Sequence, residues 1–189
     1  MDHIANKKFE GIDFREEPFI IAEYEQCNFI KCNFQGIDIR RSVFIDVAFD
    51  QCDMGIIKID KASFREVKFL SCKMMGTYFE HVNPFGLSVQ FLDTNLDHAS
   101  FYKSVMRKTL FRNCSLKEAD FSNADLTESI FDNCDLDRAQ FNNTVLIKSD
   151  FRTAYHYSMD PSLNKIKHSK HSYPSVLGLL HQFDVQIDG

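Results

Sequence analysis

The sequence contains no tryptophan, only four prolines and seven glycines, and no long uninterrupted run of apolar residues. A membrane-spanning helix needs about 20 predominantly apolar residues, and a signal peptide needs an apolar core that the N-terminus MDHIANKKFEG lacks. We therefore expect a cytoplasmic protein. The few glycines form no phosphate-binding loop, and neither GxSxG nor HExxH occurs. These absences argue against an enzyme, a cofactor and a small-molecule substrate.

Basic residues are also fewer than acidic ones. The chain has 22 Lys and Arg against 27 Asp and Glu, which gives a net charge of -5. Proteins that bind nucleic acids or anionic membranes neutralise phosphate groups with clustered Lys and Arg. The composition therefore predicts no direct binding to nucleic acid and none to a membrane.

Phenylalanine, by contrast, is abundant and regularly spaced. From Phe9 a large apolar residue returns at every fifth position as far as Phe79, and after an irregular stretch at 81–90 the rhythm resumes at Phe91 and runs to Phe151. An α-helix repeats its buried face every 3.6 residues and a strand every 2, so a period of five fits neither. The position two residues before each large one is small throughout the later half, from Val89 to Ser149. A chain that points two side chains inward in every five residues, one large and one small, can wind as a solenoid.

These residues resemble a known repeat. The segments KEADFSNADLTES and DNCDLDRAQF are similar to the A(D/N)LXX unit of the pentapeptide repeat family, and the resemblance covers Phe9 to Phe151. It implies an all-β fold: a right-handed quadrilateral parallel β-helix with four repeats in each coil. We expect about seven coils over residues 1–151, with a small bulge within 81–90.

The resemblance implies that residues 20 apart stack on one wall, which the sequence itself can test. If the bulge adds two residues without changing the phase, eight phenylalanines fall in one column, namely Phe9, Phe29, Phe49, Phe69, Phe91, Phe111, Phe131 and Phe151. The same phase places Cys32, Cys52, Cys72, Cys114 and Cys134 on a second wall with Thr94. We interpret these cysteines as buried, inert thiols, because no CxxC pair is present.

The histidines near the C-terminus carry no clear chemistry. His156, His168, His171 and His181 lack acidic or cysteine partners at metal-ligand spacing. We expect them to be surface residues, and we predict no metal site.

The five-residue repeat ends at Phe151, and residues 152–189 do not show it. Pro174 is suited to the first turn of a helix, and the sequence predicts an α-helix near 174–183 that caps the open end of the coil. The segment SYPSVLGLLHQFDVQI resembles the dimer-forming C-terminal segment of the gyrase-protecting branch of the family. That resemblance implies a homodimer whose interface contains Val176, Leu177, Leu180 and Phe183.

The functional hypothesis rests on the same resemblance. The tail, the CKMMG stretch and the overall size are similar to the Qnr/McbG/AlbG branch, which protects type II topoisomerases from quinolones, microcin B17 or albicidin. This implies a non-enzymatic DNA mimic that binds DNA gyrase or topoisomerase IV. The alternative is a β-helical scaffold for protein interactions that is unrelated to topoisomerases.

Three outer surfaces are candidates for the partner contact. About seven coils at about 4.8 Å would give a rod near 34 Å long, over which B-DNA carries on the order of 20 negative charges. A net charge of -5 would therefore have to be unevenly distributed. The candidate acidic wall contains Asp53, Asp97, Glu118, Asp135 and Asp137, interleaved with Lys73, Lys117 and Arg138, so an ordinary solvated face is an equal alternative. The other candidates are an outward apolar row, Ile30, Leu70, Leu92, Leu110 and Ile130, and the bulge residues Asn83, Pro84 and Phe85.

Overall fold

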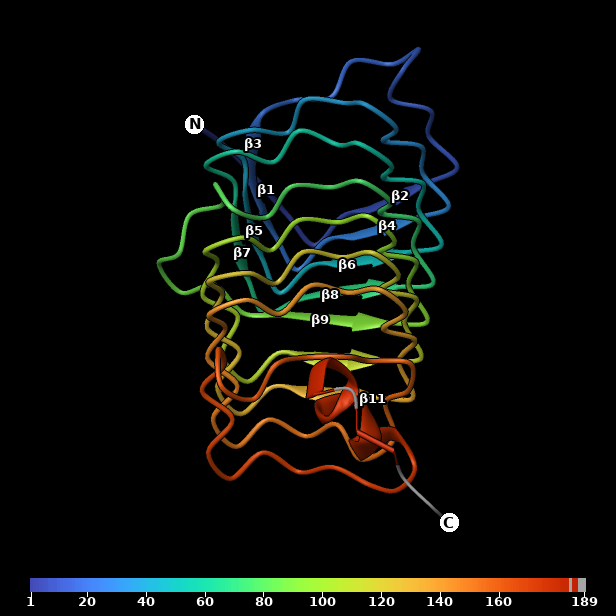
Figure 1. The fold of residues 1–189 in the computed structure, drawn as a ribbon. Helices are drawn as coiled ribbons and strands as arrows, with labels where there is room; N and C mark the ends of the chain where they lie inside the picture. The colour runs from blue at the N-terminus through green and yellow to red at the C-terminus, as the bar shows by residue number, and fades with distance from the viewer. Residues whose placement is uncertain (184, 187–189) are drawn as a thin grey trace.

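The chain winds into a four-walled parallel β-helix of about seven coils, as the repeat predicts (Figure 1). The computed structural model describes residues 1–183, 185 and 186. Successive coils lie one below another from the N-terminus to the C-terminus in Figure 1, and every strand pairing is parallel. The predicted fold class is confirmed.

Two of the four walls contain regular strands. The first wall is a seven-stranded sheet in the order β11-β10-β9-β8-β6-β4-β2, and the fourth wall is a four-stranded sheet in the order β1-β3-β5-β7. The strands of the first wall are β2 (Lys8–Glu10), β4 (Asn28–Ile30), β6 (Ala48–Asp50), β8 (Val67–Leu70), β9 (Val89–Leu92), β10 (Leu110–Arg112) and β11 (Ile130–Asp132). Those of the fourth wall are β1 (Asp2–Ala5), β3 (Ala22–Glu25), β5 (Val43–Ile45) and β7 (Ser63–Arg65).

The second and third walls are held by single parallel bridges. On the second wall, which carries the cysteines, Asp53 pairs with both Asn33 and Lys73. On the third wall, Asp38 pairs with Lys58, and further along the rod Tyr78 pairs with Ser100. Each bridge joins residues 20 or 22 apart, so side chains at equivalent positions of successive coils lie above one another.

The predicted phenylalanine column is confirmed. Phe69 pairs with Phe91 across β8 and β9, which shows that the irregular stretch adds two residues and keeps the coils in phase. Consecutive rings of the column are stacked with centroids 4.6 to 5.3 Å apart and interplanar angles of 4 to 14°. Rings at the other inward positions meet this column edge to face, as Phe101 meets Phe111. The aromatic core is thus a continuous stack inside the rod.

The small inward residues fill the walls, and most of their polar atoms form hydrogen bonds, although the buried hydroxyl of Ser42 has no partner in the described chain. The hydroxyl of Ser129 donates to the carbonyl of Met106 at 2.7 Å, and that of Thr144 donates to the carbonyl of Phe121 at 2.9 Å. All six cysteines are buried and unpaired, as predicted, and the thiol of Cys52 donates to the carbonyl of Phe29 at 3.3 Å. The neighbouring thiol of Cys52 and burial raise the pKa of Cys32. A thiol held in its neutral form is a poor nucleophile.

The fifth residue of each repeat lies at a corner of the coil, where the backbone adopts a left-handed conformation. The residue two places after each central side chain has a positive φ at most corners, as in Asn123 (61°), Asn133 (53°) and Asn143 (55°). This left-handed conformation costs about 1–2 kcal/mol for residues other than Gly, and Asn tolerates it better than most. A hydrogen bond to the next coil offsets part of this cost, since the N–H of Asn123 donates to the carbonyl of Asn142 at 2.8 Å.

The bulge ends the four-stranded sheet after β7. Val82 and Leu87 turn inward, while Pro84 and Phe85 are exposed on a loop that projects at the left of Figure 1. The side chain of Asn83 donates to the hydroxyl of Ser63 at 2.9 Å and accepts from the N–H of Phe85 at 3.1 Å. The loop is therefore anchored to the coil above it.

The winding continues beyond the last periodic phenylalanine. Val145 pairs with Lys165 and Asp150 pairs with Lys170, so a further coil follows Phe151. The expected α-helix near 174–183 is not confirmed, because this segment forms two 3-10 turns, η1 (Ser175–Leu179) and η2 (His181–Phe183). An isolated helix of ten residues has little stability of its own, so contacts of this segment with the rod determine its conformation.

The tail also lies in a different place from the predicted one. It runs along the side of the last coils instead of covering the open end (Figure 1), and the N–H of Met159 donates to the carbonyl of Gly178 at 3.2 Å. Asp184 and residues 187–189 of the predicted C-terminal cap lie outside the described residues. In the part of the chain that the structure describes, no helix has the length and apolar character needed to cross a bilayer.

Candidate interaction surfaces

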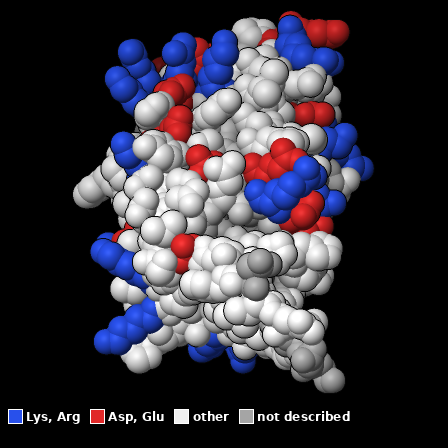
Figure 2. Space-filling view, in the orientation of Figure 1, with Lys and Arg blue, Asp and Glu red and all other residues white. Residues whose placement is uncertain are grey.

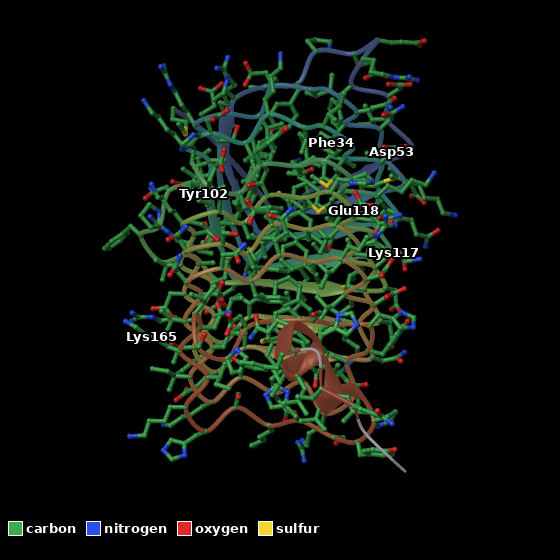
Figure 3. The ribbon with its side chains drawn as sticks, in the orientation of Figure 1. Phe34, Asp53, Tyr102, Lys117, Glu118 and Lys165 are labelled. Atoms are coloured by element: carbon green, nitrogen blue, oxygen red, sulfur yellow. The ribbon has the colours of Figure 1, made fainter. Side chains whose placement is uncertain are left out.

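The five candidate acidic residues lie on the second wall and its corner toward the third wall. Figure 3 shows Asp53 and Glu118 on the same side of the rod as Lys117. Asp53, Asp97, Asp135 and Asp137 occupy outward positions of that wall in three different coils, and Glu118 occupies a corner with φ of 56°. The five residues thus lie on one side of the rod, and their role as a partner contact stays a prediction.

Their charges are largely matched by neighbouring bases. Asp135 lies 2.9 Å from the imidazole of His156 and 3.4 Å from the ammonium group of Lys117. Arg138 bridges Glu118 at 3.1 Å and Asp137 at 3.3 Å. The second wall is thus a mixed-charge surface. Its local charge agrees with the alternative interpretation, an ordinary solvated face with interleaved acids and bases.

Of the two remaining acids of this set, Asp53 has a base nearby, whereas Asp97 is held by hydrogen bonds from a hydroxyl and a backbone N–H. Asp53 lies 4.0 Å from the ammonium group of Lys73. Asp97 accepts hydrogen bonds from the hydroxyl of Ser115 at 2.6 Å and from the N–H of Lys117 at 3.0 Å. Burial is the largest single influence on the pKa of Asp135 and raises it, but the hydrogen bonds from His156, the N–H of Asp137 and Lys117 together outweigh burial, so the pKa lies below its usual range. All five carboxylates have hydrogen-bond or ion-pair partners within the chain.

The tail and the second wall enclose a hollow of about 770 Å³, lined by residues that include Lys117, Asp135, Tyr155, Leu177 and His181. Gly178 permits the close approach of the two segments, because a Cβ at this position would lie 2.0 Å from the carbonyl oxygen of Tyr157. Any larger residue at this position would push the tail away from the rod.

The four residues predicted for the dimer interface divide into two pairs. Val176 and Leu177 are half-buried, whereas Leu180 is 39% and Phe183 is 51% exposed. Tyr173 is also exposed, at 79%. The C-terminal end of the rod therefore presents several large apolar groups to solvent.

The bulge presents the most exposed aromatic ring outside the tail. Phe85 is 76% exposed, and the guanidinium carbon of Arg65 lies 5.7 Å from its ring centroid. Pro84 is exposed beside it, while Asn83 faces the rod. The outward apolar row on the first wall is less prominent, because of its members only Ile130, at 43%, is exposed and the others are half-buried.

The prediction that His171 is a surface residue was wrong. Its imidazole is half-buried, and it lies 2.9 Å from the hydroxyl of Tyr157 through Nδ1 and 2.9 Å from the hydroxyl of Ser169 through Nε2. Burial lowers the pKa of His171 below its ordinary value. The signal was present in the sequence, since His171 follows Phe151 by 20 residues and takes the next place in the column.

Sequence reasoning also missed a basic corner between the third and fourth walls. The residues two places after the central side chain are Arg41, Lys61, His81 and Lys103 in four successive coils, and all are exposed. Among the residues that the structure describes, no three His, Cys, Asp or Glu side chains are grouped closely enough to hold a metal ion.

Comparisons with known proteins agree with the architecture. The family model described as "Pentapeptide repeat region" matches residues 19–101 and 44–121, and the model "Pentapeptide repeats (8 copies)" matches residues 119–155. A search of functionally curated proteins gives no match to this chain.

Solved structures with the same fold include two trypsin-treated forms of QnrB1, a plasmid-mediated fluoroquinolone resistance protein. One matches with a TM-score of 0.68 at 16% identity, over 98% of this chain and 100% of that chain. The other matches with a TM-score of 0.58 at 20% identity, over 100% and 92% of the two chains.

HetL, a pentapeptide repeat protein from the cyanobacterium Nostoc sp. strain PCC 7120, is also similar. It is involved in the regulation of heterocyst differentiation, and it matches with a TM-score of 0.67 at 16% identity, over 89% of this chain and 87% of that chain. The repeat rhythm, the stacked core and the family models together show that the chain belongs to the pentapeptide repeat family.

Proposed function

We propose that this chain is a non-enzymatic binding protein that acts as a dimeric rod on a type II topoisomerase, DNA gyrase or topoisomerase IV, and protects it from an inhibitor. The observation that supports this most directly is the match to QnrB1, which spans 98% of this chain and 100% of that chain and thus includes the C-terminal segment. The exposed side chains of Leu180 and Phe183 support dimer formation through this segment.

The mechanism that we propose is competition with DNA for the positively charged surface of the enzyme. The rod supplies the elongated shape, and carboxylates supply the negative charge. Asp46, Asp50 and Glu66 have no basic group within 4.0 Å in the described part of the chain, and they lie on the first wall or at its corner with the fourth wall. A carboxylate without a partner can bind a cation of the enzyme without first breaking an ion pair. We therefore place the acidic contact there as well as on the second wall.

A DNA supercoiling assay with purified gyrase, with and without ciprofloxacin or albicidin, tests the proposal. We expect the protein to restore supercoiling in the presence of one of these inhibitors and to compete with DNA when in excess. The combined variant Asp46→Asn, Asp50→Asn and Glu66→Gln should lose this activity. The matched control changes three exposed acids of the first coil, Asp2→Asn, Glu16→Gln and Glu17→Gln, and should keep it. Absence of both inhibition and rescue at micromolar wild-type protein would overturn the proposal.

A second function, an interaction scaffold unrelated to topoisomerases, is favoured by one observation. Four of the five candidate acids of the second wall lie within 4.0 Å of a base, as Glu118 lies 3.1 Å from Arg138, which makes this wall unlike a continuous row of phosphates. In the supercoiling assay a scaffold would leave gyrase unaffected whether or not an inhibitor is present.

A further inference from the structure

The basic corner is a column of Arg41, Lys61, His81 and Lys103 on adjacent coils, in which the imidazole of His81 lies 3.9 Å from the carboxylate of Glu80. The N–H of Lys61 donates to the carbonyl of His81 at 2.7 Å, and the bridge between Tyr78 and Ser100 places Lys103 in the next coil. Neighbouring side chains of the column are thus separated by about the 4.8 Å spacing of parallel strands. Figure 2 shows Lys and Arg projecting along the left edge of the rod, with some acids beside them in the N-terminal half, and charges of both signs at the right edge.

The cations of this column lack the partners that bases have elsewhere on the rod. Within the described residues, no carboxylate lies within 4.0 Å of Arg41, Lys61 or Lys103, whereas Arg112 lies 2.8 Å from Asp132 and Arg138 lies 3.1 Å from Glu118. Arg41 and Lys61 are on directly adjacent coils, where like charges are destabilising. An anion bound from outside would relieve this repulsion.

A hollow of about 310 Å³ lies beside the column. It is lined by Ile21, Asp38, Arg40, Arg41, Asp60 and Lys61. Asp38 is already bound by Arg40, with Nε 2.9 Å from Oδ1. The rim of the hollow therefore offers the free cations Arg41 and Lys61 together with an aliphatic side chain, Ile21, which is 47% exposed.

The opposite edge of the third wall carries a strained and exposed isoleucine. Ile56 has φ of 48°, and among the described residues it is the only β-branched residue with a positive φ. It is nevertheless 62% exposed and lines a second hollow, of about 350 Å³, with Tyr78, which is also 62% exposed. Backbone strain at an exposed apolar residue costs stability and gives no core packing in return, which is a pattern typical of binding sites.

We propose that the N-terminal half of the third wall binds an acidic protein segment that carries a bulky apolar side chain. The carboxylates of this segment bind Arg41, Lys61 and Lys103, and its apolar side chain contacts Ile56 and Tyr78. A protein segment suits this surface better than a nucleic acid, because the exposed side chains of Ile56 and Tyr78 match an apolar side chain, which a phosphate backbone does not carry. The partner has the opposite charge from the DNA-binding surface of a topoisomerase, so this site is separate from the proposed function.

Fluorescence anisotropy with labelled probes tests the charge requirement. The probe is a 12-residue peptide of the repeat Glu-Glu-Leu, and its two controls are the Gln-Gln-Leu peptide and a 12-nucleotide single strand of DNA. We expect the acidic peptide to bind and both controls to bind at least 10-fold more weakly. Stronger binding of the oligonucleotide than of the acidic peptide would overturn the proposal in favour of a nucleic-acid site.

Two variants with equal net charge localise the site. Arg41→Glu, Lys61→Glu and Lys103→Glu combined should weaken binding of the acidic peptide at least 10-fold. The control, Lys31→Glu, Lys68→Glu and Lys167→Glu combined, changes three exposed lysines that also lack a carboxylate within 4.0 Å in the described chain, and should change the affinity less than twofold. Equal losses in the two variants would show that only the overall charge matters and would overturn the proposal. Glu occurs with positive φ at Glu66, Glu118 and Glu128, so the corner accepts the substitution.

The apolar part of the site has its own test. Ile56→Asn should weaken binding of the Glu-Glu-Leu peptide several-fold while leaving the fold intact, because Asn tolerates the left-handed conformation. Unchanged affinity for this variant would overturn the assigned role of Ile56. Neither this variant nor the charge reversal at the corner alters the acids of the supercoiling assay, so failure here and failure of topoisomerase protection are separate results.

Discussion

The imidazole of His171 stacks on the ring of Phe151, with centroids 5.5 Å apart and an interplanar angle of 4°. The aromatic column that begins at Phe9 thus ends in a titratable ring. Protonation of this ring introduces a charge at the end of an otherwise apolar stack. The last coil should therefore be the part of the rod that is most sensitive to acid.

This relationship predicts the pH dependence of stability. Burial lowers the pKa of His171 in the folded state below its ordinary value of 6.5, so the unfolded chain binds the proton more readily. The contribution of the neutral ring is fully present above pH 6.5 and is lost as the pH falls from there through the folded-state pKa. In His171→Phe this loss should disappear. Thermal unfolding of both proteins between pH 8 and pH 5 measures it, and parallel curves would contradict the prediction.

The aromatic stack predicts a large difference between two phenylalanines. Phe111 is 0% exposed and stacks on both Phe91 and Phe131, whereas Phe85 is 76% exposed. Phe111→Ala should lower the free energy of unfolding by about 3–5 kcal/mol, since it leaves a cavity in the core. Phe85→Ala should change it by less than about 0.5 kcal/mol. Urea unfolding measures both, and similar losses would contradict the stacked core.

Much of the interior was predictable because the repeat sets it directly. Phe91 and Cys114 follow from the five-residue rhythm and the 20-residue coil, and a single two-residue bulge kept the phase. The tail was not predictable in the same way, since the segment around Gly178 follows no repeat and its conformation depends on contact with Tyr157. The charge pairing on the surface could not be predicted for a different reason. The acids of the second wall were recognised, but whether each is paired depends on side chains from the adjacent coil.

The left-handed corner predicts an unusual gain in stability. Ile56 adopts φ of 48° with its side chain 62% exposed, so replacing it removes strain and little buried surface. Ile56→Asn should raise the free energy of unfolding by about 1 kcal/mol. The matched change Ile130→Asn, in β11 with regular strand geometry, should lower it, because Ile is favoured in strands over Asn. Urea unfolding of the two variants measures both effects. A lower free energy of unfolding for both variants would show that replacing Ile56 relieves no backbone strain.

The exposed apolar groups of the tail predict the oligomeric state. If Leu180 and Phe183 form the proposed dimer interface, replacing both by Asp should give a monomer, because two charged groups would be buried without partners. Phe85→Asp changes a ring that is more exposed, at 76%, and should leave the oligomeric state unchanged. Light scattering after gel filtration measures the mass of each variant. A wild-type monomer, or a dimer that survives the double substitution, would refute this role of the tail.

Docking of the tail depends on a single glycine. A Cβ at Gly178 would lie 2.0 Å from the carbonyl oxygen of Tyr157, while one at Gly55 would have its nearest neighbour at 3.6 Å. Gly178→Ala should therefore displace η1 from the last coils and break the hydrogen bond that Met159 donates to the carbonyl of Gly178. Hydrogen exchange at the Met159 amide should accelerate at least 10-fold in Gly178→Ala and stay unchanged in Gly55→Ala. Because the rod ends in the stack of His171 on Phe151 and not in the tail, the core amides should keep their protection in both variants. Loss of protection throughout the coils would mean that the tail is needed to hold the last coil closed.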